Sequence, residues 1–238
     1  MITFLGLADP FSSLLHVFAF LLFVFATPTL LEGAGVDAER FRAARRYMLA
    51  ACAMFLFSAT YHALPHESGW RPLFWHLDHG AIWLAIAGSL AVTQATFFAQ
   101  RSWARWWRRG TWSLAVAGAT LELTVLRYLP DWASPLLYIA IGWMGLPVVI
   151  AVWRAGRRDA STLCVAGGLL ATLGGVMDSL SWPNLLPGLV EGHECMHVAT
   201  TLGGILWLTP NWLEARRELE VPALELEPVA EPVLVGVE

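Results

Sequence analysis

The sequence predicts an all-α integral membrane protein with seven transmembrane helices. Of its 238 residues, 57% are hydrophobic and 14% are charged, a composition far from that of soluble globular domains. One helical crossing of a bilayer needs about 20 apolar residues. Seven segments approach that length: 11–31, 44–64, 74–98, 111–129, 134–153, 161–181 and 193–212.

The first segment has no basic residue before it and no clear small-residue cleavage site, so we expect a retained helix rather than a removed signal peptide. The second segment ends with Ser58 and His62, which are four residues apart and therefore lie on one helical face. The third begins with Asp78, followed by His79. Ionisable side chains are costly inside hydrophobic segments and usually functional there, which makes His62 and Asp78 candidate site residues.

The fourth segment carries Glu122, a carboxyl group that needs a partner or a cavity at such a depth. The fifth, 134–153, is counted as a span on its apolar length alone. The sixth ends near Asp178, and the seventh opens with His193 and His197, again four residues apart. Both imidazoles of this pair can therefore reach one ion.

Small residues and the C-terminal composition complete the predicted organisation. Paired glycines, including those at Gly167 and Gly203, predict close helix packing in lipid. Residues 214–238 are rich in Glu and Pro, which predicts a disordered acidic tail in the cytoplasm. The membrane domain is then expected to comprise residues 1–213.

The basic residues predict the orientation of the chain. All fifteen are Arg, and thirteen lie in or beside the loops that follow the first, third and fifth segments and after the seventh. Only Arg71 and Arg127 lie on the other side. The positive-inside rule therefore predicts an extracytoplasmic N-terminus and a cytoplasmic C-terminus. It places His62, Asp78 and His193 near the extracytoplasmic face.

The imidazoles of His62, His193 and His197 are predicted to bind zinc. Three His ligands with an open position are a recurrent arrangement for catalytic zinc, in which the zinc-bound water becomes a nucleophile near neutral pH. Neutral imidazole also suits iron and manganese. Asp78 is expected to act as general base and proton shuttle, with Ser58 assisting through a hydrogen bond to the water or a substrate carbonyl.

Three further polar residues are candidates for orienting the ligands. They are His79, Asp178 and Glu194, because a ligating imidazole usually donates its second N–H to a neighbouring acceptor. A hydrated helix end explains Glu194 equally well. The histidines outside these motifs, including His16, are better explained as interfacial side chains that hydrogen-bond near a helix end.

These motifs resemble a known superfamily. Ser58 and His62 in the second segment, Asp78 in the third and His193 and His197 in the seventh are similar to the pattern of seven-helix membrane hydrolases. That superfamily includes the hemolysin III proteins, progestin and adiponectin receptors, alkaline ceramidases and Per1-like proteins.

Two local strings resemble the hemolysin III and receptor branch in particular, FSATYH at 57–62 and LDHGAIWLAIAGS at 77–89. The resemblance implies zinc held by the three histidines, the aspartate beside the zinc-bound water and, in several members, cleavage of lipid amides or esters. Members of this branch are generally taken to have a cytoplasmic N-terminus, so the arginine pattern is a departure that leaves the branch open.

Together these observations predict a zinc-dependent membrane hydrolase, ceramidase-like or lipase-like, that takes a lipid amide or ester from the bilayer. Amide and ester remain open. The alternative is a receptor-like or structural seven-helix protein in which zinc only ties helices together. Nothing in the sequence suggests nucleic-acid binding, and the absence of Lys excludes a retinal Schiff base. Two histidines on one helical face suit a small ion better than haem.

Overall fold

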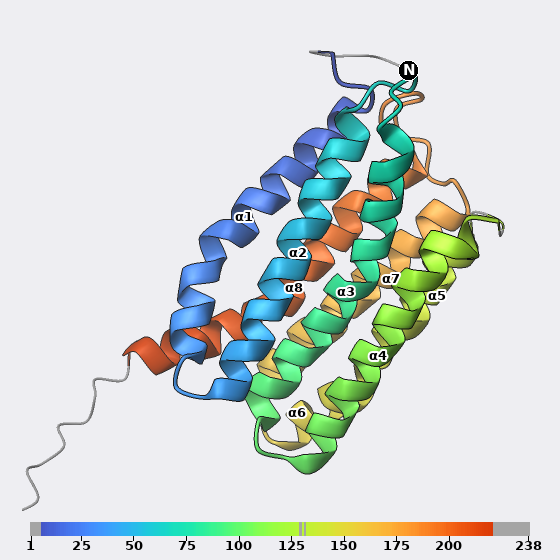
Figure 1. Cartoon of the computed structure of the whole chain (residues 1–238). Coiled ribbons are helices and arrows are strands. Elements are labelled where there is room, and N and C mark those ends of the chain that lie inside the picture. Colours follow the sequence, from blue (N-terminus) through green and yellow to red (C-terminus); the bar gives the residue numbers. More distant parts are fainter. Residues whose placement is uncertain (1–5, 129, 131, 221–238) are drawn as a thin grey trace, which may run out of the picture.

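The computed structural model describes residues 6–128, 130 and 132–220, and within these ranges the regular structure is helical. Figure 1 shows the helices packed side by side in an elongated bundle. Its elements are α1 (Pro10–Ala34), α2 (Ala38–Ala63), α3 (Arg71–Phe98), α4 (Ser102–Thr124), the 3₁₀ turn η1 (Leu126–Tyr128), α5 (Ala133–Trp143), α6 (Leu146–Arg154), α7 (Arg158–Ser179) and α8 (Gly192–Glu220).

The predicted bundle of seven membrane helices is confirmed when α5 and α6 are counted as one interrupted span. Four stretches are long and apolar enough to cross a membrane, namely α1, α3, the α5–α6 stretch and α7. The other three helices, α2, α4 and α8, carry arginines or acidic residues toward one end. Those charges lower their mean hydropathy without shortening the helices.

The fifth span is broken, whereas the sequence predicted one continuous helix over 134–153. α5 ends at Trp143 and α6 begins at Leu146, with Pro147 in its first turn. Proline has no N–H for the carbonyl one turn earlier, so it interrupts the helical hydrogen bonds. The side chain of Trp107 in α4 donates to the carbonyl of Met144 at 3.1 Å and so satisfies one of the backbone groups at the break.

Helix packing brings distant parts of the sequence to one end of the bundle. α1 lies against α2 and α8, α2 against α3, and α7 against α8. The end of α2 and the beginnings of α1, α3 and α8 therefore meet at the end that carries the N-terminus, uppermost in Figure 1. A Cβ on Gly167 of α7 would lie 2.6 Å from the carbonyl oxygen of Gly203 in α8, which confirms the predicted close glycine packing.

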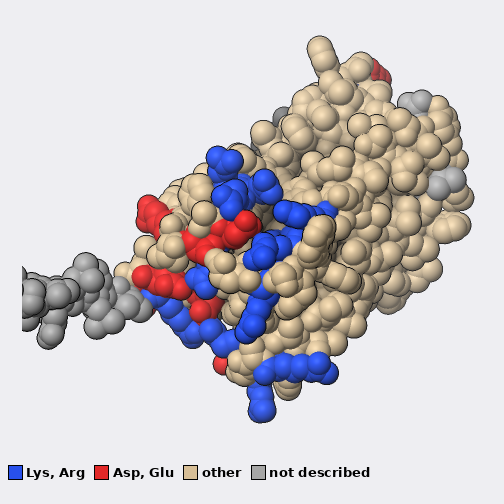
Figure 2. All heavy atoms as spheres, turned by 60° about the horizontal axis from the view of Figure 1, so that its bottom comes forward, with Lys and Arg blue, Asp and Glu red and all other residues tan. Residues whose placement is uncertain are grey.

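The opposite end of the bundle carries most of the arginines, whereas Arg71 lies at the histidine end. Figure 2 shows them gathered on this face and interspersed with acidic side chains. Arg40 pairs with Glu218 at 2.8 Å and joins α2 to α8, and Arg157 pairs with Glu214 and joins the start of α7 to α8. Both ion pairs lie at the ends of the helices, and their side chains are partly exposed.

The last helix is longer than expected. α8 runs to Glu220, whereas the sequence predicted a tail from residue 214. Arg216 pairs with Glu220 four positions later, Glu218 pairs with Arg40 of α2, and Glu214 pairs with Arg157 just before α7. The charged residues therefore stabilise the helix instead of ending it. The rest of the predicted tail, 221–238, lies outside the described residues.

Candidate metal centre

Three imidazoles converge where the end of α2 meets the first turns of α8. Nε2 of His197 lies 3.2 Å from Nε2 of His62 and 3.0 Å from Nε2 of His193. His62 and His197 are buried, whereas the side chain of His193 is 44% exposed. The cluster therefore has a closed inner side and an open side at His193.

The outer nitrogens of two of these rings contact carboxylates. Nδ1 of His193 lies 2.8 Å from Oδ1 of Asp178 at the end of α7, and Nδ1 of His62 lies 3.3 Å from Oδ2 of Asp9 before α1. An ionised carboxylate only accepts hydrogen bonds, so beside an ionised carboxylate each of these Nδ1 atoms is the donor. A neutral imidazole that donates through Nδ1 has its lone pair on Nε2, and both of these lone pairs face His197.

Nitrogens that lie this close together could hold a metal ion. Nε2 of His197 carries at most one proton, so it can satisfy only one of the two lone pairs that His62 and His193 present to it. A single cation held by the three nitrogens satisfies all of them at once, and neutral imidazole is the commonest protein ligand for metals such as zinc. A shared cation would therefore accommodate the close approach of these three nitrogens.

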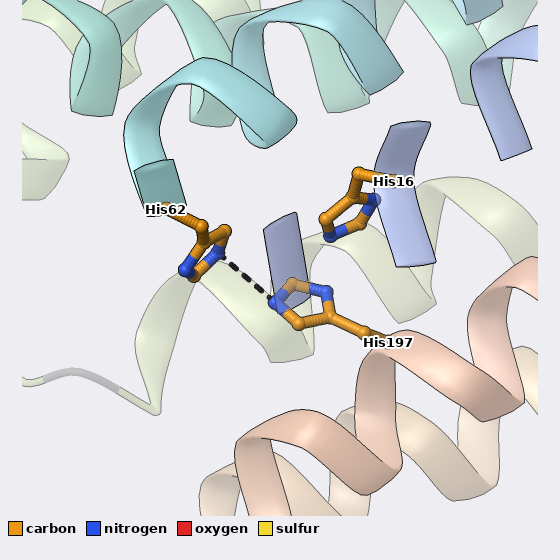
Figure 3. A group of neighbouring side chains, drawn as sticks. All are labelled: His16, His62 and His197. Atoms are coloured by element: carbon orange, nitrogen blue, oxygen red, sulfur yellow. Dashed lines mark hydrogen bonds between the residues drawn. The ribbon is translucent and has the colours of Figure 1, made fainter. Parts of the chain in front are cut away.

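A fourth imidazole lies against this cluster. Figure 3 shows His16 of α1 beside His62 and His197, and the ring centroids of His16 and His197 are 4.3 Å apart. The ligand atoms of these three residues lie within 4.8 Å of one another, so they form a second set that could hold a metal ion. The two sets share His62 and His197 and differ in using His16 or His193.

The expectation that His16 is an interfacial hydrogen-bonding residue is wrong. The ring is buried, and neither of its nitrogens has a hydrogen-bond partner within the described residues. A signal was present in the sequence, because Ser12 precedes His16 by four residues and so repeats the spacing of Ser58 and His62. The spacing alone does not show that α1 packs against the ends of α2 and α8, which is what brings His16 to the cluster.

Asp78 and Ser58 lie beside the imidazoles and are buried. Ser58 is one helical turn before His62 and lies within hydrogen-bonding range of Asp78 in α3. Asp78 also lies near His79, His62 and His193. The structure therefore brings together the five residues that the two spaced motifs and Asp78 singled out.

Of the three residues expected to orient the ligands, one contacts a histidine of the cluster and the other two have different hydrogen-bond partners. Asp178 contacts His193, as described above. His79 instead directs Nδ1 to the carbonyl of Trp75 at 2.9 Å and stacks on that indole ring. Glu194 accepts hydrogen bonds from Ser12 and from the backbone of the residue three positions before it, so it stabilises the start of α8 and its packing on α1.

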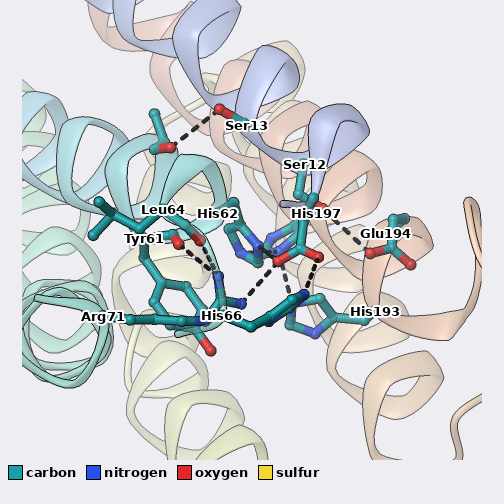
Figure 4. A network of polar contacts seen from close by, with 12 residues as sticks. Ser12, Ser13, Tyr61, His62, Leu64, His66, Arg71, His193, Glu194 and His197 are labelled. Carbon is teal, nitrogen blue, oxygen red and sulfur yellow. Dashed lines mark hydrogen bonds and ion pairs between the residues drawn. The ribbon is translucent and has the colours of Figure 1, made fainter. Parts of the chain in front are cut away.

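Arg71 closes the end of the site next to His62. Its guanidinium donates to the carbonyls of Tyr61 at 3.2 Å and Leu64 at 2.6 Å, and to Oδ2 of Asp9 at 2.9 Å (Figure 4). Burial by itself raises the pKa of Asp9, but the hydrogen bonds from His62 and Arg71 outweigh it and lower the pKa from 3.8 to about 2. Asp9 is therefore ionised at neutral pH.

Comparison with known proteins identifies the family. The sequence model of the haemolysin-III-related proteins matches residues 7–208, which run from just before α1 into α8. The chain belongs to the haemolysin-III-related family. This confirms the resemblance drawn from the motifs, and with the four apolar stretches it makes the chain a multi-pass integral membrane protein.

One curated relative of this haemolysin-III-related chain is Hemolysin-3 of Bacillus cereus. The two are 30% identical over 124 residues, which is 52% of this chain and 55% of the relative. The chain therefore matches about half the length of that protein. The family match itself covers most of the membrane bundle, including every residue of both histidine sets.

Proposed function

We propose that this chain is a metal-dependent membrane hydrolase that cleaves a lipid amide or ester. In this proposal His62, His193 and His197 hold a zinc ion. When bound, such an ion polarises a carbonyl group and acidifies water near neutral pH. The convergence of the three Nε2 atoms carries the proposal, because no arrangement of protons among neutral rings satisfies all three.

His193 rather than His16 is the third ligand in this proposal. A ligating imidazole almost always donates its other nitrogen to an acceptor, and His62 and His193 both do so. His16 has no such partner in the described residues, so nothing fixes its tautomer or its ring orientation. Its edge contact with His197 is explained as packing against the closed side of the site.

Asp78 accepts and returns a proton in the proposed reaction. Its carboxyl group is buried, lies near His62 and His193, and has the hydroxyl of Ser58 within hydrogen-bonding range. Ser58 orients that carboxyl group and can also donate to a substrate carbonyl. Neither residue needs to form a covalent bond to the substrate.

Substrate reaches the site from the bilayer in this account. The exposed side of the cluster is at His193, next to a loop whose apolar side chains Leu180 and Trp182 are exposed. Most of the arginines gather at the other end of the bundle, which supports an extracytoplasmic N-terminus and an extracytoplasmic site. A lipid with an amide or ester bond near its headgroup suits this depth.

The test uses purified protein in liposomes that contain one lipid amide and one lipid ester of equal acyl length. We expect release of fatty acid from at least one of them. Asp78→Asn should lower the rate by about 10²–10⁴-fold, the usual contribution of general acid–base catalysis, while bound metal is retained. Glu122→Gln is the matched control, because it neutralises a buried carboxyl group away from the histidines.

Metal-loaded protein that turns over neither lipid class would contradict the hydrolase. It would favour the alternative in which the ion ties α2 to α8 as a receptor-like or structural element. Equal rates for wild type and Asp78→Asn would instead remove Asp78 from the chemistry and leave the metal site intact.

A further inference from the structure

Two aspartates occupy the same position at the start of their helices but behave differently. Asp9 precedes α1 and Asp37 precedes α2, each as the N-cap residue. Aspartate is favoured there because its carboxylate accepts hydrogen bonds from the first free N–H groups of the helix. Asp37 does this with the N–H groups of Glu39 and Arg40, whereas the side chain of Asp9 makes no capping hydrogen bond.

The carboxylate of Asp9 is directed to His62 instead. Oδ2 lies 3.3 Å from Nδ1 of His62, and the backbone N–H of Asp9 donates to the carbonyl of His62 at 2.9 Å. The same residue therefore contacts both the ring and the backbone of His62. Two contacts at the end of α2 fix the position of the ring more tightly than one would.

Arg71 holds Asp9 in this position. Its guanidinium bonds Oδ2 of Asp9 and, at the same time, the last carbonyl groups of α2, and it lies 4.4 Å from the centroid of the Tyr61 ring. The side chains of Asp9 and Arg71 are 19% and 14% exposed, so this pair is largely shielded from water. Since Arg71 cannot accept a hydrogen bond, Asp9 remains an acceptor for His62.

We propose that Asp9 is a positioning residue of the metal centre, which holds His62 as the Nδ1–H tautomer so that the Nε2 lone pair faces His193 and His197. The inference rests on the proposed metal site and adds the segment before α1 to it. The imidazoles of His62 and His193 then have the same arrangement, because Nδ1 of each contacts one carboxylate. The carboxylate is that of Asp9 for His62 and that of Asp178 for His193.

The test compares Asp9→Asn with Asp37→Asn in the full-length protein. Affinity for Zn²⁺ is measured by competition with a chelator, and the visible absorption of bound Co²⁺ reports the ligand geometry. Loss of a carboxylate behind a ligating His usually lowers metal affinity by about 10–100-fold. We expect that loss and an altered Co²⁺ spectrum for Asp9→Asn, and neither for Asp37→Asn.

Two further measurements separate positioning from folding. Asp9→Glu keeps an ionised acceptor and should recover part of the affinity, which a purely structural role would not predict. The unfolding temperature of Asp37→Asn should stay close to that of wild type, because asparagine caps a helix about as well as aspartate, and its metal affinity should not change.

The outcomes are distinguishable from those of the proposed function. Wild type that binds metal, with Asp9→Asn equal to it in affinity and Co²⁺ spectrum, overturns the role of Asp9 and leaves the metal site standing. Wild type that is folded and binds no metal overturns both. An equal loss of affinity in Asp9→Asn and Asp37→Asn also overturns the positioning role, because it would show a general effect on folding.

Discussion

Two of the buried polar clusters among the described residues differ in whether the protein alone can satisfy their hydrogen bonds. In the first, Oε2 of Glu122 accepts from the indole N–H of Trp83 at 3.2 Å, and Oε1 accepts from the hydroxyl of Ser134 at 2.9 Å. In the second, the Nε2 atoms of His62 and His193 both face Nε2 of His197.

The difference separates a packing element from a site. Buried polar groups are almost always hydrogen-bonded in native proteins, and the Glu122 cluster follows that rule with donors from α3 and the start of α5. The histidine cluster meets it only when a cation accepts the surplus lone pairs. Glu122 therefore stabilises the contacts of α3, α4 and α5, while the histidine cluster is the one that could hold an ion.

The largest effect on bound metal should come from substituting His193, the residue by which one histidine set differs from the other. We expect His193→Ala to lose bound metal and His16→Leu to retain it, because only His193 is oriented by a carboxylate. Leucine also removes two unpartnered nitrogens from the interior, so the unfolding temperature of His16→Leu should not fall. Elemental analysis of both purified variants checks this. Loss of metal from His16→Leu together with its retention in His193→Ala would show that His16, and not His193, is the third ligand.

The second-largest effect should be the loss of bound metal from the histidine cluster at acidic pH. Protons compete with a metal for imidazole nitrogen, so bound metal should be lost as the pH falls below about 6.5, the ordinary pKa of histidine. The lowered pKa of Asp9 means that its ionic contribution is present above pH 3.8 and is lost only as the pH falls towards about 2. Metal content after dialysis across this range should thus fall while Asp9 remains ionised.

The Glu122 cluster should respond in stability and not in metal content. Glu122→Leu leaves the donors of Trp83 and Ser134 without an acceptor, at a cost of about 1–3 kcal/mol for each donor left unpaired in the interior. Glu122→Gln keeps one acceptor and should cost less. Denaturation in detergent and metal analysis of the same samples measure both effects. Loss of metal from Glu122→Leu while the protein stays folded would break the distinction between the clusters.

The smallest effect is expected at the arginine end. Arg40 and Glu218 form an ion pair at 2.8 Å with both side chains partly exposed, and such pairs contribute less than about 1 kcal/mol. Arg40→Ala should therefore change the unfolding temperature slightly and the metal content not at all. A large loss of stability would mean that this end of α8 is coupled to the histidine end through the helix.

Much of this arrangement could be predicted from the sequence, because apolar length and four-residue spacing are local features. The apolar length predicts the helical spans. The spacing and the position of each residue within its span predict that His62, His193 and His197 lie near Ser58 and Asp78. Asp178 could be proposed for the same reason, since it ends the span before the histidine pair.

What the sequence could not show depends on packing between distant segments. The role of Asp9 follows from its distance to His62, which is 53 positions away in the chain, and an aspartate before a helix ordinarily predicts only a cap. His16 lies in the site because α1 packs against both α2 and α8. The break between α5 and α6, in contrast, has a local signal, because Pro147 interrupts an otherwise continuous apolar segment.

The most direct test of the central claim is the metal content of the protein as purified in detergent without added metal. Elemental mass spectrometry should find about one zinc ion per chain in wild type and none in folded His197→Ala, because His197 contacts both other ligands. Wild type that is folded but contains no zinc, iron or manganese would contradict the account. The converging nitrogens of the three histidines would then have no explanation in terms of a bound ion.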